Sequence, residues 1–215
     1  KCEPGGVLVN KDLMNNFGKA GGNVGTVMDF TSASLNTGFL AMAAELDLCD
    51  INEMAKRLGV SYGDGSDITK DKYDEAGNQI EAANAPYASV LGSKNVSPMA
   101  MAGAYATVAN GGKYCQPTAI DSITGPNGEA IEPPKTTCEQ VISPEVAATA
   151  AHALQRVMSS GTGTPSNTWD GTPLIGKTGT HESWGTMMIE SSTKVTTAIW
   201  VGRSEGQASI LKQSW

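Results

Sequence analysis

Residues 171–180 read Gly-Thr-Pro-Leu-Ile-Gly-Lys-Thr-Gly-Thr, and the fold of the chain depends on the structure that they adopt. The stretch satisfies the phosphate-loop pattern G-x-x-x-x-G-K-[ST]. That pattern requires a buried strand before the loop and a helix after it, because the helix supplies free N–H groups for the phosphates. The same residues can instead be extended, with Lys177 at the start of a strand. The neighbouring sequence distinguishes these two structures.

The residues on both sides of this stretch favour the strand. Residues 159–167, upstream, form a loop of small residues without a strand, and residues 179–186, downstream, contain two glycines and several β-formers, which oppose a helix. Residues 184–201 have the pattern of two strands joined by the short polar stretch 190–194. We therefore predict that Lys177 begins the first strand of an antiparallel meander. A P-loop nucleotide hydrolase is the disfavoured alternative.

A lysine at this place in a strand has a specific chemical use. At the lip of a cleft, Lys177 can hold both a substrate carboxylate and a catalytic hydroxyl. Thr178 and Thr180 occupy alternate positions, so they face the same side of the strand. Gly179 between them removes a side chain where a ligand or another backbone must come close. The alternative is a lysine and two threonines on a solvated strand.

Composition limits the class of protein. The chain has 215 residues, of which 40% are apolar and 17% charged, as in a globular domain. Its net charge of −7 argues against a nucleic-acid partner. The sequence has no signal peptide and no apolar run long enough to span a membrane. Because it begins Lys1-Cys2 rather than with Met, we expect a processed product or an excised piece of a longer protein.

The four cysteines are Cys2, Cys49, Cys115 and Cys138. None has C-x-x-C spacing, so a zinc ribbon is not expected, and we predict no metal site. Cys115 and Cys138 bracket a predicted hairpin and can be bridged across it. Such a disulfide would place the domain outside the cytoplasm. The alternative is four ordinary buried thiols.

Helical periodicity begins at Leu35, where apolar residues recur at helical spacing. Ser32 or Ser34 is the candidate N-cap of this helix. Asp50 is the expected N-cap of a second helix, because a glutamate follows three residues later as in a capping box. Gly59 is expected to end that helix.

The rest of the chain alternates helices with β structure. Ser97-Pro98 and Ser143-Pro144 each place a capping serine before a proline, which predicts two further helices. Between them, residues 113–142 form a predicted β excursion with Asn127-Gly128 at a hairpin turn. Residues 61–86 are acidic and are expected to be a solvated loop. These elements predict an α+β fold, with a helical cluster packed on an antiparallel sheet.

Four stretches together resemble the transpeptidase domain of penicillin-binding proteins, most closely that of the bifunctional, class A-like enzymes that build the cell wall. They are Ser34-Leu35-Asn36-Thr37, residues 97–112, Gly161-Thr162-Gly163, and Gly176-Lys177-Thr178-Gly179-Thr180 followed by Ile199-Trp200-Val201-Gly202. Each stretch alone is a weak signal, but all four occur in the order that the family has. The resemblance covers most of residues 24–202.

The resemblance implies a penicillin-binding/β-lactamase-like fold that is incomplete at its N-terminal side. Residues 1–215 would form the C-terminal part of the transpeptidase domain. Within it, the helical portion would span about 30–110, the hairpin excursion about 113–142, and a helix with the sheet strands about 143–202. Without its early strands the sheet would have an unpaired edge, which requires cover.

The catalytic motifs of the family are S-x-x-K, S-x-N and K-T-G, in that chain order. Ser34-Leu35-Asn36 matches the second motif and Lys177-Thr178-Gly179 the third, but no S-x-x-K precedes Ser34. Ser191-Ser192-Thr193-Lys194 follows K-T-G in a predicted turn. We interpret it as a chance match, because the motif needs a helical turn to place residues i and i+3 side by side. The nucleophilic serine is therefore expected on an upstream segment or another chain, and this chain alone is expected to be inactive.

The resemblance implies a serine-type D-Ala-D-Ala transpeptidase, an acyltransferase that cross-links peptidoglycan stem peptides and is acylated by β-lactams. Lys177 would polarise Ser34, whose hydroxyl would relay a proton to the leaving group. Asn36 would hold the missing lysine or the substrate amide. Thr180 would offer its backbone N–H to the oxyanion.

The substrate-binding residues implied by the resemblance are Thr178, Gly179 and Thr180, with the two hydroxyls on the substrate carboxylate. No cofactor or metal is needed. The implied location is extracytoplasmic, in a bacterial cell envelope, with membrane attachment only through a missing N-terminal anchor. Two alternatives stay open besides the nucleotide hydrolase: a serine β-lactamase or carboxypeptidase of the same fold, and a non-catalytic module that binds wall peptide or a partner.

Overall fold

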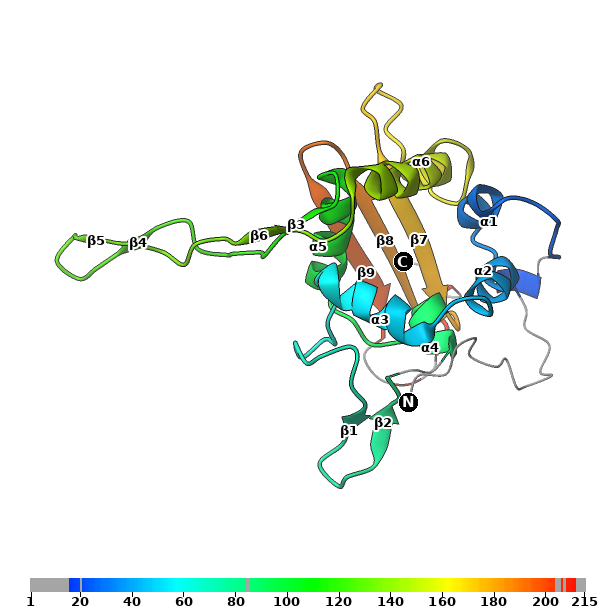
Figure 1. Ribbon diagram of the computed structural model, residues 1–215, viewed down its shortest axis with the longest axis horizontal. Coiled ribbons are helices and arrows are strands. Elements are labelled where there is room, and N and C mark those ends of the chain that lie inside the picture. Colours follow the sequence, from blue (N-terminus) through cyan, green and yellow to red (C-terminus); the bar gives the residue numbers. More distant parts are fainter. Residues whose placement is uncertain (1–15, 20, 84–85, 204–205, 207, 212–215) are drawn as a thin grey trace.

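A computed structural model describes residues 16–19, 21–83, 86–203, 206 and 208–211. The fold is α+β, with helices arranged around a central antiparallel sheet (Figure 1). The helices are η1 (Phe17–Lys19), α1 (Val27–Ala33), α2 (Asn36–Ala43), α3 (Leu48–Arg57), α4 (Pro86–Leu91), α5 (Pro98–Ala109), α6 (Pro144–Ser160) and η2 (Thr164–Ser166). The strands are β1 (Lys72–Tyr73), β2 (Gln79–Glu81), β3 (Lys113–Cys115), β4 (Ile123–Thr124), β5 (Ala130–Ile131), β6 (Cys138–Gln140), β7 (Ile175–His181), β8 (Gly185–Ser191) and β9 (Thr196–Gly202).

The central sheet has three strands in the order β7-β8-β9, and both pairings are antiparallel. The predicted meander is therefore confirmed, although β7 begins at Ile175 rather than at Lys177. Residues 182–184 connect β7 to β8. Glu182 and Ser183 have positive φ angles of 46° and 65°, as the two central residues of a type I′ turn do, and the N–H of Trp184 closes the turn on the carbonyl of His181. The phosphate loop is excluded, because Lys177 lies inside a strand and no helix follows it.

Helices α5 and α6 form the core with this sheet. α5 packs against β8 and β9, and α6 packs against β7. Val157 and Met158 of α6 are almost fully buried, as are Ile175 of β7 and Ile189 of β8. Each such side chain contributes about 1.5–3 kcal/mol by leaving water. This packing fixes the position of the strand that carries Lys177.

The segment that leads into α2 differs from the prediction. α2 follows the periodicity that starts at Leu35, but Leu35 itself is its N-cap and makes no side-chain capping bond. Ser32 lies inside α1, and Ser34 is the C-cap of α1, so neither serine caps α2. The sequence pattern did not predict α1, a helix of seven residues.

The capping predictions for the other helices have mixed outcomes. Asp50 is not the N-cap of α3. That residue is Asp47, whose carboxylate accepts a 2.7 Å hydrogen bond from the N–H of Cys49, and Asp50 lies in the first turn. Ser97 and Ser143 are confirmed as the N-caps of α5 and α6. Two aspartates stand near the start of α3. Asp47 has the extended backbone of an N-cap, whereas the predicted Asp50, three residues later, is already helical.

Two hairpins project from the body (Figure 1). Residues 61–86, predicted as a loop, contain the short hairpin of β1 and β2. The predicted excursion of residues 113–142 is a long arm, with β3 and β6 at its base and the β4–β5 hairpin toward its tip. Cys115 and Cys138 face each other across β3 and β6 and form the predicted disulfide.

The outer edge of the sheet is at β9. Among the described residues, β9 pairs with β8 alone. Ile199, Trp200 and Val201 of β9 are 57%, 45% and 42% exposed. The sequence analysis predicted an unpaired edge, and within the described part of the chain β9 is one of the two edge strands of this sheet, β7 being the other.

Candidate active site

The first feature of the site is a hydrogen bond between the two motif residues. Nζ of Lys177, on β7, lies 2.6 Å from Oγ of Ser34, at the end of α1. The same ammonium donates a 2.7 Å hydrogen bond to the carbonyl of Thr178. The fold thus joins the S-x-N and K-T-G stretches into one site.

Strand β7 rises from the core to the surface along its length. Gly176 is buried, Lys177 and Thr178 are half-buried, and Thr180 is exposed. Gly176 is needed where the strand is deepest, because a Cβ there would lie 2.5 Å from the sulfur of Met158 and 2.8 Å from a backbone oxygen. Lys177 is therefore held at the lip of the interior, with its backbone anchored and its ammonium directed to Ser34.

Burial changes the acidity of Lys177. It lowers the pKa of the ammonium from 10.5 to about 8, because the charged form loses hydration. The side chain is thus mostly a cation at neutral pH, yet it can exchange a proton in a mildly alkaline solution. Such a group can polarise the hydroxyl of Ser34 and stabilise negative charge nearby.

Ser34 has an unusual backbone conformation. Its φ and ψ of 55° and 46° are left-handed. The N–H of Leu35 donates to the carbonyl of Phe30 at 3.0 Å, and the N–H of Ser34 donates to that of Thr31 at 3.3 Å. This is the Schellman pattern, in which glycine usually takes the left-handed position. A serine there costs about 1 kcal/mol, and the strain is consistent with a functional role for its hydroxyl.

Close packing of α1 and α2 fixes the rest of the S-x-N stretch. Asn36 is the first residue of α2 and is half-buried. Gly38, two residues further, lies against α1, and a Cβ there would come within 2.5 Å of the ring of Phe30. The N–H of Thr37 donates to Oδ1 of Asn16 at 3.1 Å. These contacts hold Ser34 and Asn36 at the junction of the two helices.

The two threonines of the K-T-G-T stretch make different contacts. Oγ1 of Thr178 lies 2.6 Å from Oγ1 of Thr162, in the loop after α6. Oγ1 of Thr180 lies 3.3 Å from Oγ1 of Thr186, which also donates to the carbonyl of Gly179 at 2.8 Å. A Cβ on Gly179 would meet no atom within 4 Å, so this part of β7 is open to a ligand. Thr162 was part of the resemblance, but nothing in the sequence gave it a role.

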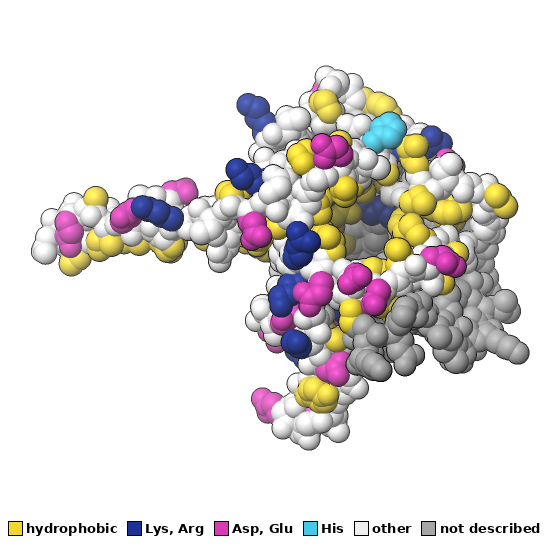
Figure 2. All heavy atoms as spheres, viewed as in Figure 1, with side chains coloured by type: hydrophobic (Ala, Val, Ile, Leu, Met, Phe, Trp, Pro, Cys, Tyr) yellow, Lys and Arg dark blue, Asp and Glu magenta, His cyan; other side chains and the backbone are white. Residues whose placement is uncertain are grey.

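The space in front of the sheet is hollow. Figure 2, in the same view as Figure 1, shows a depression over the central sheet that is bounded by hydrophobic side chains.

Residues 1–208 match the family described as the penicillin binding protein transpeptidase domain. The chain belongs to this family. It is 34% identical over 164 residues to penicillin-binding protein 1F of Bacillus subtilis, an alignment that covers 71% of this chain and 21% of that protein. It is 30% identical over 162 residues to penicillin-binding protein 1A of Clostridium novyi, covering 73% of this chain and 18% of that protein.

Solved penicillin-binding proteins share the fold. The imipenem acyl-enzyme complex of penicillin-binding protein A from M. tuberculosis superposes with a TM-score of 0.70 at 22% identity, covering 94% of this chain and 48% of that one. PonA1 from M. tuberculosis gives 0.71 at 22% identity, with 92% and 53% covered. The D,D-transpeptidase domain of a peptidoglycan glycosyltransferase from Eggerthella lenta gives 0.66 at 21% identity, with 93% and 54% covered. The chain thus spans about half of these solved chains and about a fifth of the curated relatives.

The S-x-x-K stretch at residues 191–194 lacks the geometry of a penicillin-binding nucleophile. Ser191 is the last residue of β8, only 2% exposed, and its Oγ contacts Oγ1 of Thr196 at 2.6 Å. The sequence holds a second S-x-x-K stretch, residues 209–212. Ser209 and Leu211 lie in a segment without helix, and Lys212 is outside the described residues. Neither stretch shows the helical turn that the motif uses.

The site gathers polar groups from α1, β7 and the loop after α6. Across the described ranges, no three His, Cys, Asp or Glu side chains gather in a way that could hold a metal ion. The described residues also contain no helix with the length and apolar character needed to cross a membrane. The polar contacts are the ammonium of Lys177 with the hydroxyl of Ser34, and the hydroxyl of Thr162 with that of Thr178. Two positions further along β7, the hydroxyl of Thr180 contacts that of Thr186.

Proposed function

We propose that this chain supplies the S-x-N and K-T-G side of a peptidoglycan D,D-transpeptidase site, and that the nucleophilic serine lies outside residues 1–215. The observation that carries the proposal is the hydrogen bond from Lys177 to Ser34. It brings the second and third motifs of the family together. The absence of a helical S-x-x-K from the described residues supports a nucleophile on another segment or chain.

The reaction begins with formation of an acyl-enzyme. The hydroxyl of the external serine loses its proton to a neighbouring base and attacks the carbonyl carbon between the two D-Ala residues of a stem peptide. The C–N bond breaks, and the departing D-Ala amine receives a proton. An amine of a second stem peptide then attacks the ester, forms the cross-link amide and returns a proton to the serine. No oxidant, metal or cofactor is consumed.

In this scheme each residue of the chain has a distinct task. The Lys177 ammonium stabilises negative charge and polarises Ser34, which passes the proton to the leaving amine. Asn36 holds the external lysine of S-x-x-K or the substrate amide. The backbone N–H of Thr180 is one oxyanion donor. Thr178 and Thr180, beside the open space at Gly179, bind the terminal carboxylate of the substrate.

β-Lactams are the expected inhibitors. Their strained amide mimics the peptide carbonyl, so the same serine would be acylated. The structural neighbour with imipenem bound is described as an acyl-enzyme complex. Hydrolysis by a β-lactamase or carboxypeptidase of the same fold is a weaker candidate, because the curated relatives named above are penicillin-binding proteins.

We place the protein in the bacterial cell envelope, outside the cytoplasm. The disulfide between Cys115 and Cys138 supports an oxidising compartment. The named curated relatives are bacterial. We expect the full protein to be attached to the membrane by a segment outside residues 1–215.

A gel assay with a fluorescent penicillin tests the function. The chain alone should show no covalent label, and the protein that also contains the upstream segment should be labelled. If the longer protein stays unlabelled while it binds stem peptide, the second candidate applies: a non-catalytic module of the penicillin-binding fold. The observation that favours this candidate is that no S-x-x-K stretch precedes Ser34 in the sequence.

A further inference from the structure

The loop of residues 161–163, which follows α6, contacts both halves of the proposed site. The N–H of Thr162 donates a 3.0 Å hydrogen bond to the carbonyl of Ser32 in α1. Oγ1 of Thr162 lies 2.6 Å from Oγ1 of Thr178 in β7. One residue thereby links the helix that ends at Ser34 to the strand that carries Lys177.

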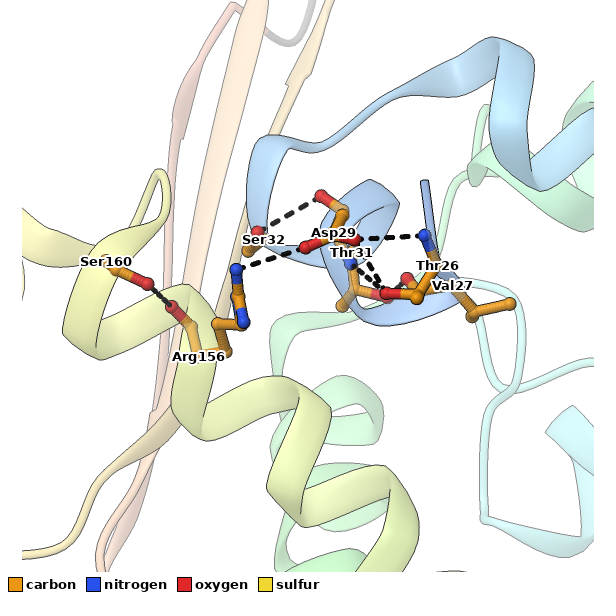
Figure 3. A network of polar contacts seen from close by, with 7 residues as sticks. All are labelled: Thr26, Val27, Asp29, Thr31, Ser32, Arg156 and Ser160. Carbon is orange, nitrogen blue, oxygen red and sulfur yellow. Dashed lines mark hydrogen bonds and ion pairs between the residues drawn. The ribbon is translucent and has the colours of Figure 1, made fainter. Parts of the chain in front are cut away.

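The contact with α1 is close to the catalytic hydroxyl. Ser32 is buried and lies one residue from the end of α1, and Ser34 is the C-cap of that helix. A second contact with α1 comes from helix α6 itself: Arg156 of α6 forms a 3.0 Å ion pair with Asp29 of α1 (Figure 3). Both partners of this ion pair are substantially exposed, so it should contribute little.

The contact with β7 is equally direct. Thr178 receives the Thr162 contact through its hydroxyl, and its carbonyl accepts the hydrogen bond from Nζ of Lys177. Thr178 is thus in contact with Thr162 through its side chain and with Lys177 through its backbone. Thr162 itself is exposed, so its side chain contributes little to the core.

The flanking glycines are closely packed against neighbouring elements. A Cβ on Gly161 would collide with the carbonyl oxygen of Ser32. A Cβ on Gly163 would lie 2.7 Å from the sulfur of Met158 and 3.2 Å from the carbonyl of Val157. The backbone of the loop is thus pressed against α1 on one side and α6 on the other. Such close contact transmits position between the two elements.

We propose that Thr162 is a positioning residue, which sets the distance between Ser34 Oγ and Lys177 Nζ by fixing α1 and β7 to the same loop. The inference rests on the proposed function. Thr162 acts through Ser34 and Lys177, and its hydroxyl is the essential group. A displacement of about 1 Å at a reacting centre can cost on the order of a hundredfold in rate, which gives the expected scale.

The experiment compares T162V, T162S and R156Q in the protein that contains this chain and its upstream segment. Valine keeps the shape of threonine without the hydroxyl, and serine keeps the hydroxyl. We expect acylation by fluorescent penicillin to slow about 10- to 100-fold in T162V, and to stay within about threefold of wild type in T162S and R156Q. The thermal midpoint of T162V should stay within about 4 °C of wild type.

Two further measurements separate positioning from a merely structural role. In T162V the alkaline limb of the acylation rate should move to higher pH, because a less constrained Lys177 gains hydration and its pKa rises. In a double-mutant cycle with T178V, adding T162V should slow acylation much less than it does in wild type, because both changes break the same contact.

The outcomes are distinct for the two claims. If wild type is not acylated, the proposed function fails and the positioning role fails with it. If wild type is acylated and T162V reacts at the same rate with the same pH profile, only the positioning role is overturned. Additive losses in the T178V cycle would also overturn it. If T162V does not fold, T162S decides, since a large loss with the hydroxyl retained contradicts the inference.

Discussion

Nζ of Lys177 lies 2.6 Å from Oγ of Ser34, so two residues 143 positions apart in the sequence share one hydrogen bond. The lysine comes from a strand that rises out of the core, and the serine from the left-handed end of a short helix. Their meeting brings the S-x-N and K-T-G stretches together, which is the arrangement that the proposed chemistry uses.

Replacement of Lys177 by methionine tests that chemistry. K177M removes the cation while it keeps an unbranched side chain in the half-buried position. We expect acylation of the protein with its upstream segment to slow about 100- to 1,000-fold, as for loss of one preorganised donor to a developing charge. Stopped-flow measurement with a fluorescent penicillin gives the rate. A loss below about threefold would remove Lys177 from the mechanism.

The pH dependence of acylation follows from the same residue. The pKa of Lys177 is lowered to about 8 by burial, and the proposed mechanism uses the protonated form. The acylation rate should therefore fall as pH rises through about 8, whereas an ordinary lysine would keep its charge to above pH 10. The rate of K177M, although low, should lack this limb. A wild-type profile that stays flat to pH 10 would contradict the role of the cation.

The stability of the protein should respond to pH in the opposite sense. The pKa of Lys177 is about 8 when folded and near 10.5 when unfolded, so between these values the unfolded chain binds more protons. Stability contributed by Lys177 therefore rises with pH across this window. Below about pH 8, K177M should gain at most ~3 kcal/mol relative to wild type, offset by its lost hydrogen bond. Urea unfolding should show this difference shrink toward pH 10.5, and a difference independent of pH would contradict the burial of a charged lysine.

Substitutions at Ser34 separate its backbone from its hydroxyl. Both S34G and S34A remove the hydroxyl, so both should slow acylation severely. They should differ in stability, because glycine tolerates the left-handed conformation and alanine does not. We expect S34G to unfold with about the same free energy as wild type or up to ~1 kcal/mol more, and to exceed S34A by about 1 kcal/mol. Chemical denaturation measures the stability, and near-normal acylation by S34G would show that the hydroxyl is dispensable.

Local sequence signals predicted those parts of the fold that depend on neighbours in the chain. The meander around Lys177 and the hairpin turn at Asn127-Gly128 are confirmed, because period-two patterns and turn residues act over a few positions. The contact of Ser34 with Lys177 has no local signal. It was expected only through the order of motifs in a known family.

The missed elements have physical explanations. α1 has only seven residues behind a glycine-rich stretch, although Thr26 and Asp29 form a capping box that marks its start. The role of Thr162 depends on contacts with two other elements, which no spacing in the sequence encodes. The hairpin of β1 and β2 is short and highly exposed, so its residues carry no alternating pattern.

The most direct test of the account is to identify which serine is acylated. The protein with its upstream segment would be treated with a penicillin, digested and mapped by mass spectrometry, alongside residues 1–215 alone. We predict one adduct on a serine outside residues 1–215 and none on the isolated chain. An adduct on Ser191, Ser209 or Ser34 would contradict the claim that this chain supplies only the S-x-N and K-T-G side of the site.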